Sequence, residues 1–175
     1  MNIRHARDLI IRPVLKHLGR KYGSKEAENM LLIIGETESG FSLRKRLPYT
    51  QVQIGQGAAG LWQFELDGGC AEFEFSEKLT HFRRIAAELR YPTVREETHQ
   101  AIMAGADILA CIMARAILWL EPEPLPDFKD VDEMYRQYLS IWQPGKPNRE
   151  RFNLAYLTIT DLFPKGKKLR TLYSL

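Results

Sequence analysis

The chain has 175 residues, of which 45% are hydrophobic and 27% charged, and its formal net charge is +3. This length favours one domain with a sizeable core, and the composition is that of an ordinary globular protein rather than a disordered or fibrous one. The mild basicity would suit an anionic polymer such as cell wall or nucleic acid, but it does not choose between them.

Cysteine, histidine and N-terminal patterns bear on compartment and cofactors. Cys70 and Cys111 stand alone without a CxxC motif, so one disulfide and two free thiols are both compatible with the sequence. The N-terminal residues lack an apolar core long enough for a signal peptide, and no segment approaches a membrane span. The histidines show no ligand spacing, so we expect neither a metal site nor another cofactor.

Two helices are predicted before Gly40. The first covers residues 2–19, and Pro13 is expected to kink or restart it because proline lacks a backbone N–H. Ser24 is a good N-cap for the second helix, which begins at Lys25. Apolar residues then repeat at i, i+3, i+4 and i+7, the pattern of a helix with one buried stripe: Ala27, Met30, Leu31 and Ile34.

The middle of the chain is predicted to be more irregular. Residues 41–56 combine alternating residues with turn formers, which favours a loop or a small β-hairpin. Residues 57–65 are expected to restart a short helix. Ser76 is expected to cap a further helix, whose buried stripe consists of Leu79, Phe82, Ile85, Ala86 and Leu89.

A long apolar helix is predicted at the centre of the domain. Thr93 and Glu96 have the spacing of a capping box, and the helix that they open covers about 94–119. This segment is apolar nearly all round, which is typical of a fully buried helix. After the proline-spaced segment 121–127 come two amphipathic helices, lined by Val131, Met134, Tyr135, Tyr138 and Trp142 and by Phe152, Ala155, Tyr156 and Ile159. The sequence therefore predicts a mostly α domain around one buried central helix.

One glutamate has the position expected of a catalytic acid. At 100° per residue, Glu38 extends the stripe that ends at Ile34, whereas Glu36 points to the opposite side. A carboxyl group at the end of an apolar stripe is partly desolvated, which raises its pKa. Glycosidic cleavage needs such a protonated carboxylic acid, because the leaving oxygen must receive a proton. Gly40 should end the helix and leave Glu38 at a rim that a substrate can reach.

The same residues resemble a family. Glu38 and Ser39, followed by the GLWQ segment 60–63, resemble the ES and GLMQ motifs of lytic transglycosylases. The likeness is closer still to phage virion proteins related to these enzymes. It continues through 122–126 (PEPLP) and 135–146 (YRQYLSIWQPGK), so that it covers about residues 25–160 in motif order.

The resemblance implies a lysozyme-like fold of the lytic transglycosylase type, as a single domain over residues 1–160. Glu38 would act first as acid and then as base on the β-1,4 bond between N-acetylmuramic acid and N-acetylglucosamine. The sugar's own 6-hydroxyl would close an anhydro ring, so no second carboxylate is needed. Gln63 would hydrogen-bond the glycan, and Gly60 would allow close backbone approach. The full set of implied substrate-binding residues is Ser39, Gly60, Leu61, Trp62, Gln63, Tyr135 and Tyr138.

Two features depart from the family pattern. A basic insert, Arg44 to Arg46, lengthens the interval between Glu38 and Gly60, and the family's Tyr-Asn pair is not evident where Ser140 and Ile141 stand. A hydrolytic, lysozyme-like route would need a second carboxylate; the candidates, each more typical of a solvated surface residue, are Glu65, Asp67 and Glu72.

Three functions follow as hypotheses. The first is a virion-associated enzyme that opens peptidoglycan during host entry, with glycan strands as its substrate and no membrane partner. The second is a catalytically degenerate structural protein of the phage tail, baseplate or portal region, docked to other virion proteins through the basic tail 161–175. Nucleic-acid binding rests only on the clusters at 44–46 and 165–170, and without a stacking or recognition-helix motif it is the weakest of the three.

Overall fold

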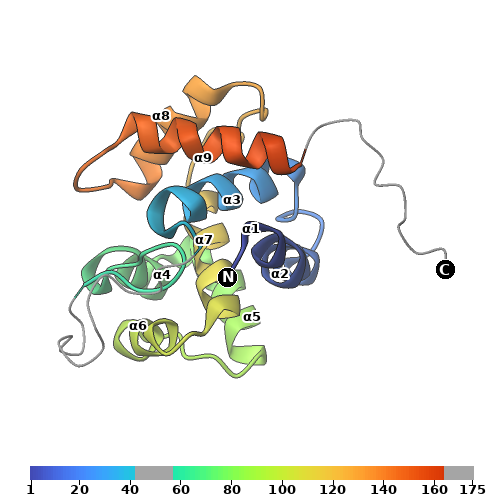
Figure 1. Ribbon diagram of the computed structural model, residues 1–175. Coiled ribbons are helices and arrows are strands. Elements are labelled where there is room, and N and C mark those ends of the chain that lie inside the picture. The colour runs from blue at the N-terminus through green and yellow to red at the C-terminus, as the bar shows by residue number, and fades with distance from the viewer. Residues whose placement is uncertain (42–56, 164–175) are drawn as a thin grey trace.

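The computed structural model describes residues 1–41 and 57–163 and has a mostly helical architecture (Figure 1). Helix α7 (Asp107–Trp119) lies at the centre, next to α3 (Lys25–Ser39). Helices α8 (Val131–Trp142) and α9 (Arg149–Leu162) cover the other side of α3. Three further helices pack around α7: α4 (Ala71–Phe75), α5 (Thr80–Glu88) and α6 (Arg95–Met103). The predicted mostly α class is confirmed.

The N-terminal helix changes type twice along its length. A short turn, α1 (Ile3–His5), runs into the wider π-helical turn η1 (Ala6–Ile11), and the regular helix α2 (Arg12–Leu18) follows. Pro13 stands in the first turn of α2, where the helix changes from the wider turn to the regular one; Ile11 and Arg12 keep right-handed helical angles, so the helix is not interrupted there.

Helix α3 begins and ends where the sequence predicts. The Ser24 hydroxyl accepts a hydrogen bond from the backbone N–H of Ala27 at 3.1 Å, and Gly40 is the C-cap in the left-handed conformation. The predicted stripe is fully buried, but so are Leu32 and Ile33 on other faces of the helix. The helix is buried nearly all round because α9 packs along it on one side, with α7 and η1 on the other.

The segment after residue 56 is a tight turn, and the short helix predicted for 57–65 is wrong. Ala59 and Phe64 form an isolated antiparallel bridge, which closes a turn that we call the 59–64 turn. Gly60 and Gln63 both have positive φ, at 74° and 53°, and a right-handed helix cannot pass through such residues. The loop or small hairpin predicted for 41–56 lies, apart from Phe41, outside the described part of the chain. The π-helical turn η3 (Leu66–Cys70) and α4 (Ala71–Phe75) follow.

The next helix starts later than predicted. Ser76 precedes a 3₁₀ turn, η4 (Glu77–Leu79), but its side chain makes no capping hydrogen bond, and the regular helix α5 (Thr80–Glu88) starts after it. Most of the predicted stripe is buried, whereas Leu89 is 39% exposed because the helix ends before it.

The long helix predicted for 94–119 is two helices, α6 (Arg95–Met103) and α7. The two helices are separated at Gly105, whose φ of 103° lies outside the helical range. Its N–H bonds to the carbonyl of Ile102, and the N–H of Ala106 bonds to that of Ala101, which is the Schellman pattern of a helix end. The predicted capping box is also wrong, because Val94 is the N-cap of α6 and no side chain caps it.

Helix α7 is the buried central helix that the composition of this segment predicts. All of its residues from Leu109 to Leu118 are buried, including Cys111. Both Cys111 and Cys70 are free, buried thiols. No helix in ranges 1–41 and 57–163 combines the length and apolar character needed to cross a membrane.

Candidate functional site

Glu38 lies in the last turn of α3, where its side chain is partly exposed. Its main-chain carbonyl accepts a hydrogen bond from Nη2 of Arg151, on α9, at 3.2 Å. A guanidinium at this place favours the helix, because the carbonyl end of a helix carries partial negative charge. Arg151 therefore joins α9 to the end of α3 at the residue predicted to be catalytic.

The carboxyl group of Glu38 is held by a residue distant in the sequence. The hydroxyl of Tyr138, on α8, donates a hydrogen bond to Oε1 of Glu38 at 2.6 Å, across 100 positions of the chain. Tyr138 is 2% exposed. Burial, followed by the hydrogen bond to the Glu38 carboxylate, raises the pKa of Tyr138 well above its usual value of 10. Tyr138 is thus a protonated donor throughout the neutral range.

Ser39 joins the end of α3 to the 59–64 turn. It is 1% exposed, and its hydroxyl donates to the carbonyl of Leu61 at 2.7 Å. The same oxygen accepts from the backbone N–H of Phe41 at 3.1 Å. Because Ser39 is buried, its position favours holding the neighbouring Glu38 in place over direct contact with a ligand.

The 59–64 turn has a geometry that depends on its glycine. The N–H and C=O groups of Ala59 and Phe64 exchange two hydrogen bonds of 2.8 Å. A Cβ atom on Gly60 would lie 2.4 Å from Cγ2 of Ile102, a distance that real contacts do not reach. The amide of Gln63 donates to the carbonyl of Gly60 at 2.7 Å across the turn. The close backbone approach at Gly60 is therefore to α6.

Trp62 and Leu61 lie in the hydrophobic core, with exposures of 0% and 1%. The indole N–H of Trp62 donates to the carbonyl of Leu31, on α3, at 2.9 Å. In turn, the indole N–H of Trp142, on α8, donates to the carbonyl of Trp62 at 3.1 Å. Gln63 is 7% exposed. The GLWQ segment is thus part of the core next to the site, and its hydrogen bonds connect it to α3 and α8.

Tyr135 lies one helical turn before Tyr138 and is only partly buried. Its ring packs edge-on against Phe152, with centroids 5.1 Å apart, and the guanidinium of Arg149 stands 4.5 Å from its centroid. The two tyrosine rings are 6.0 Å apart. Tyr135 therefore lies beside Tyr138 and packs against α9.

The structure gives Glu36 a more buried position than helical periodicity predicts. Its side chain is only partly exposed, and Oε2 is buried with no hydrogen-bond partner among the described residues. Burial raises the pKa of Glu36, and the charge of Arg151 offsets part of this rise. The run of Leu32 and Ile33 outside the predicted stripe was the available signal that α3 is buried on this side too.

Two other groups of polar residues have structural partners. Asp67, one of the alternative second carboxylates, is 83% exposed and pairs with Arg95 at 2.9 Å. His99 is fully buried, with Nε2 3.0 Å from the carbonyl of Gly57. Within the described ranges, no three histidine, cysteine or carboxylate side chains lie together in a way that could hold a metal ion.

Comparisons of the chain with protein-family models, with curated proteins and with solved structures find no match.

Proposed function

We propose that this chain is a phage virion-associated protein with a lysozyme-like domain that cleaves the glycan strands of peptidoglycan during host entry. The family and the virion location rest on the resemblance of the ES, GLWQ and tyrosine-rich segments. The observation that carries the catalytic part is the hydrogen bond from Tyr138 to Glu38. It joins the predicted acid to a residue that the resemblance independently implies for substrate binding.

The proposed reaction uses Glu38 alone as acid and base. Oε1 of Glu38 accepts the hydrogen bond from Tyr138, so in this proposal Oε2 carries the proton that is transferred to the substrate. Glu38 gives this proton to the glycosidic oxygen as the bond from C1 of N-acetylmuramic acid breaks. The 6-hydroxyl of the same sugar then bonds to C1 and returns its proton to Glu38. One carboxylate therefore ends the cycle as it began, and the products are a 1,6-anhydro end and a free 4-hydroxyl.

The rest of the site supports this role by holding the carboxyl group still. Tyr138 fixes one oxygen, Arg151 holds the main chain of the same residue, and Ser39 locks the helix end to the 59–64 turn. A catalytic group held in one geometry loses little entropy on reaching the transition state. The buried residues of the GLWQ segment act in this proposal as positioning residues.

A second candidate is the structural virion component with no activity. The burial of Leu61, Trp62 and Gln63 favours it, because a glycan would find none of the three at the surface. The amide N–H of Gln63 and the indole N–H of Trp62 are also used inside the protein.

Digestion of purified peptidoglycan separates the two candidates. Wild type, Glu38→Gln and Glu77→Gln would be compared by mass spectrometry of the released muropeptides, with Glu77 as an exposed glutamate outside the site. We expect anhydromuropeptides from wild type and Glu77→Gln and none from Glu38→Gln. Reducing ends would instead indicate hydrolysis, and a folded wild type that releases nothing would leave the structural role.

A further inference from the structure

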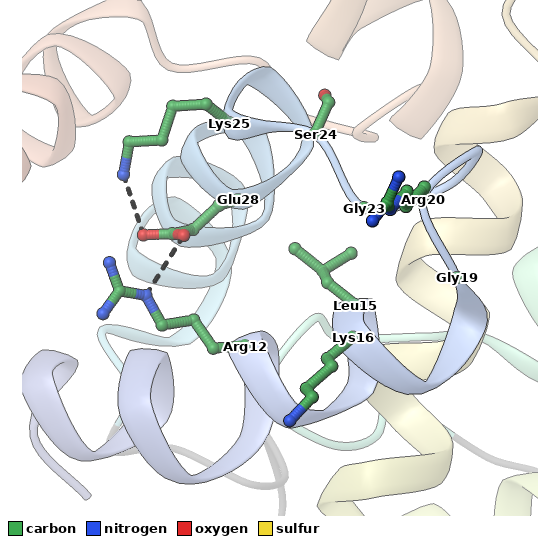
Figure 2. Close-up of a pocket in the computed structure, with 9 residues that line it drawn as sticks. All are labelled: Arg12, Leu15, Lys16, Gly19, Arg20, Gly23, Ser24, Lys25 and Glu28. Atoms are coloured by element: carbon green, nitrogen blue, oxygen red, sulfur yellow. Dashed lines mark hydrogen bonds and ion pairs between the residues drawn. The ribbon is translucent and has the colours of Figure 1, made fainter.

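A recess lies at the opposite end of α3 from Glu38. It has a volume of about 370 Å³ and is bounded by α2, the connection 19–24 and the first turn of α3 (Figure 2). This volume is within the range of roughly 300–1,000 Å³ found for small-molecule sites. Glu28 in its wall and Glu38 are ten residues apart on one helix, about 15 Å at 1.5 Å per residue. The recess is therefore separate from the candidate catalytic site.

The lining of the recess is strongly basic. It includes Arg12, Lys16, Arg20 and Lys25 with a single carboxylate, Glu28, and so carries a formal charge of +3. The formal charge of the whole chain is also +3. The lining of this one recess therefore has an excess of three positive charges.

Both carboxylate oxygens of Glu28 form ion pairs with cations of the protein. Its Oε1 lies 2.7 Å from Nε of Arg7 and 2.9 Å from Nζ of Lys25, and its Oε2 lies 3.2 Å from Nε of Arg12. Figure 2 shows Lys25 and Arg12 on either side of this carboxylate. The ion pairs fix both cations at the wall of the recess and lower the entropy cost of binding an anion there.

Two further cations of the lining have no carboxylate partner among the described residues. Lys16 and Arg20 are exposed, and neither forms a salt bridge or a side-chain hydrogen bond within the described part of the chain. The N-terminus of α3 adds the positive end of a helix dipole, with Ser24 as its N-cap. The excess positive charge therefore comes from side chains and main chain together.

A buried arginine supports the connection from behind. Arg115, on α7, is 4% exposed, and its Nε donates to the carbonyl of Tyr22 at 2.6 Å. Its Nη1 is buried without a hydrogen-bond partner, and no carboxylate pairs with it among the described residues. A buried guanidinium without a counter-ion is costly. Here it adds positive potential directly beneath the connection 19–24.

The recess also lacks the features that nucleic-acid bases require. No aromatic side chain is among its lining residues, so it has no surface on which a base could stack. Arginine and lysine side chains at a helix N-terminus are the groups that bind phosphate in proteins. We propose that this recess binds a phosphate group on a non-aromatic carrier, such as a phosphorylated polyol or sugar.

The test is an NMR titration of ¹⁵N-labelled protein with glycerol phosphate and with inorganic phosphate in low-salt buffer. We expect saturable shifts at the amides of Gly19, Gly23 and Lys25. The variant Lys16→Gln/Arg20→Gln should weaken binding roughly tenfold or more, because it removes two charge-assisted contacts. The matched variant Lys78→Gln/Lys129→Gln loses the same charge elsewhere and should bind within about twofold of wild type.

Three results would overturn the proposal: no saturable shifts, equal weakening by both double variants, or tighter binding of an oligothymidylate than of glycerol phosphate. The last would make nucleic acid the occupant. Equal affinity for inorganic phosphate and glycerol phosphate would show that the recess recognises the phosphate group alone. Tighter binding of glycerol phosphate would show that it also contacts the glycerol carrier. Glu38→Gln should leave this binding unchanged, so the inference and the proposed catalytic function fail independently.

Discussion

The indole N–H of Trp142 donates to the main-chain carbonyl of Trp62, although 80 positions separate the two residues. Tyr138 stands four residues earlier on the same face of α8 and donates to Glu38. One helix face therefore contacts both segments of the suspected motif, the end of α3 and the 59–64 turn. The predictions below test these contacts and two features of the surrounding core.

Tyr138→Phe should destabilise the protein by about 0.5–1.5 kcal/mol, because the hydrogen bond from a buried hydroxyl to the Glu38 carboxyl group is lost. Urea denaturation at neutral pH measures this change. Tyr156→Phe is the matched control, since the Tyr156 ring packs against Phe128 but its hydroxyl makes no hydrogen bond within the described residues. Equal losses in the two variants would show that the Tyr138–Glu38 bond contributes nothing measurable.

Alanine at Gly60 should be far more costly than alanine at Gly57. Both glycines have positive φ, 74° and 77°, so each change costs about 1–2 kcal/mol of backbone strain. Only at Gly60 does a Cβ collide with Ile102, which adds about 1–3 kcal/mol of overpacking. Thermal unfolding of both variants gives the difference, and indistinguishable midpoints would rule out the close contact between the turn and α6.

Glu28 should make stability depend on pH in the acid range. Burial alone would raise the pKa of Glu28, but hydrogen bonds from Lys25, Arg7 and Arg12 outweigh it and lower the pKa from 4.5 to about 2. A carboxyl with a lowered folded-state pKa stabilises the protein above its unfolded pKa, here by about 3 kcal/mol. This contribution is lost as the pH falls from about 4.5 to about 2.

Urea denaturation across that pH range checks the Glu28 prediction. Glu28→Gln should be less stable than wild type at neutral pH and should lose most of the pH dependence. Glu26→Gln, in the same helical turn but without an ion pair within the described residues, should keep it. A wild-type curve that stays flat between these pH values would contradict the ion-pair network around Glu28.

Both cysteines should be unreactive in the folded protein. Burial raises the pKa of Cys70 to about 12 and that of Cys111 higher still, and only the thiolate reacts quickly. Iodoacetamide at mildly alkaline pH should therefore modify neither thiol until urea unfolds the chain. Fast labelling of either cysteine in native conditions would mean that its environment opens.

Much of the helical framework could be predicted because its signals are local. Ser24 and Gly40 mark helix ends through hydrogen bonds and backbone angles that depend on a few neighbouring residues. The sequence does not reveal the break at Gly105, because apolar residues continue on both sides of it. When all faces of a helix are apolar, the pattern has no single stripe whose interruption would mark a helix end. Hydrophobic periodicity therefore identifies buried helices better than it divides them.

The site was predictable in part for the same reason. Helical phase places Glu38 at the end of α3, but it says nothing of the α8 residue that meets it, since only tertiary packing brings Tyr138 there. The resemblance suggested both residues for one cleft without predicting their contact. Trp62 looks like a ligand platform in the sequence, yet a large aromatic side chain is as well suited to the core, and the structure buries it completely.

The π-helical turn η1 has a consequence for insertions and deletions near the N-terminus. Such a turn holds about one residue more than an α-helical turn, and Leu9 within it is 68% exposed. Deleting Leu9 would remove little packing but would rotate everything before it by about 100° relative to α2. Arg7 would then leave Glu28. The wide turn therefore sets the direction in which the residues before it face relative to α2, and the contact of Arg7 with Glu28 depends on it.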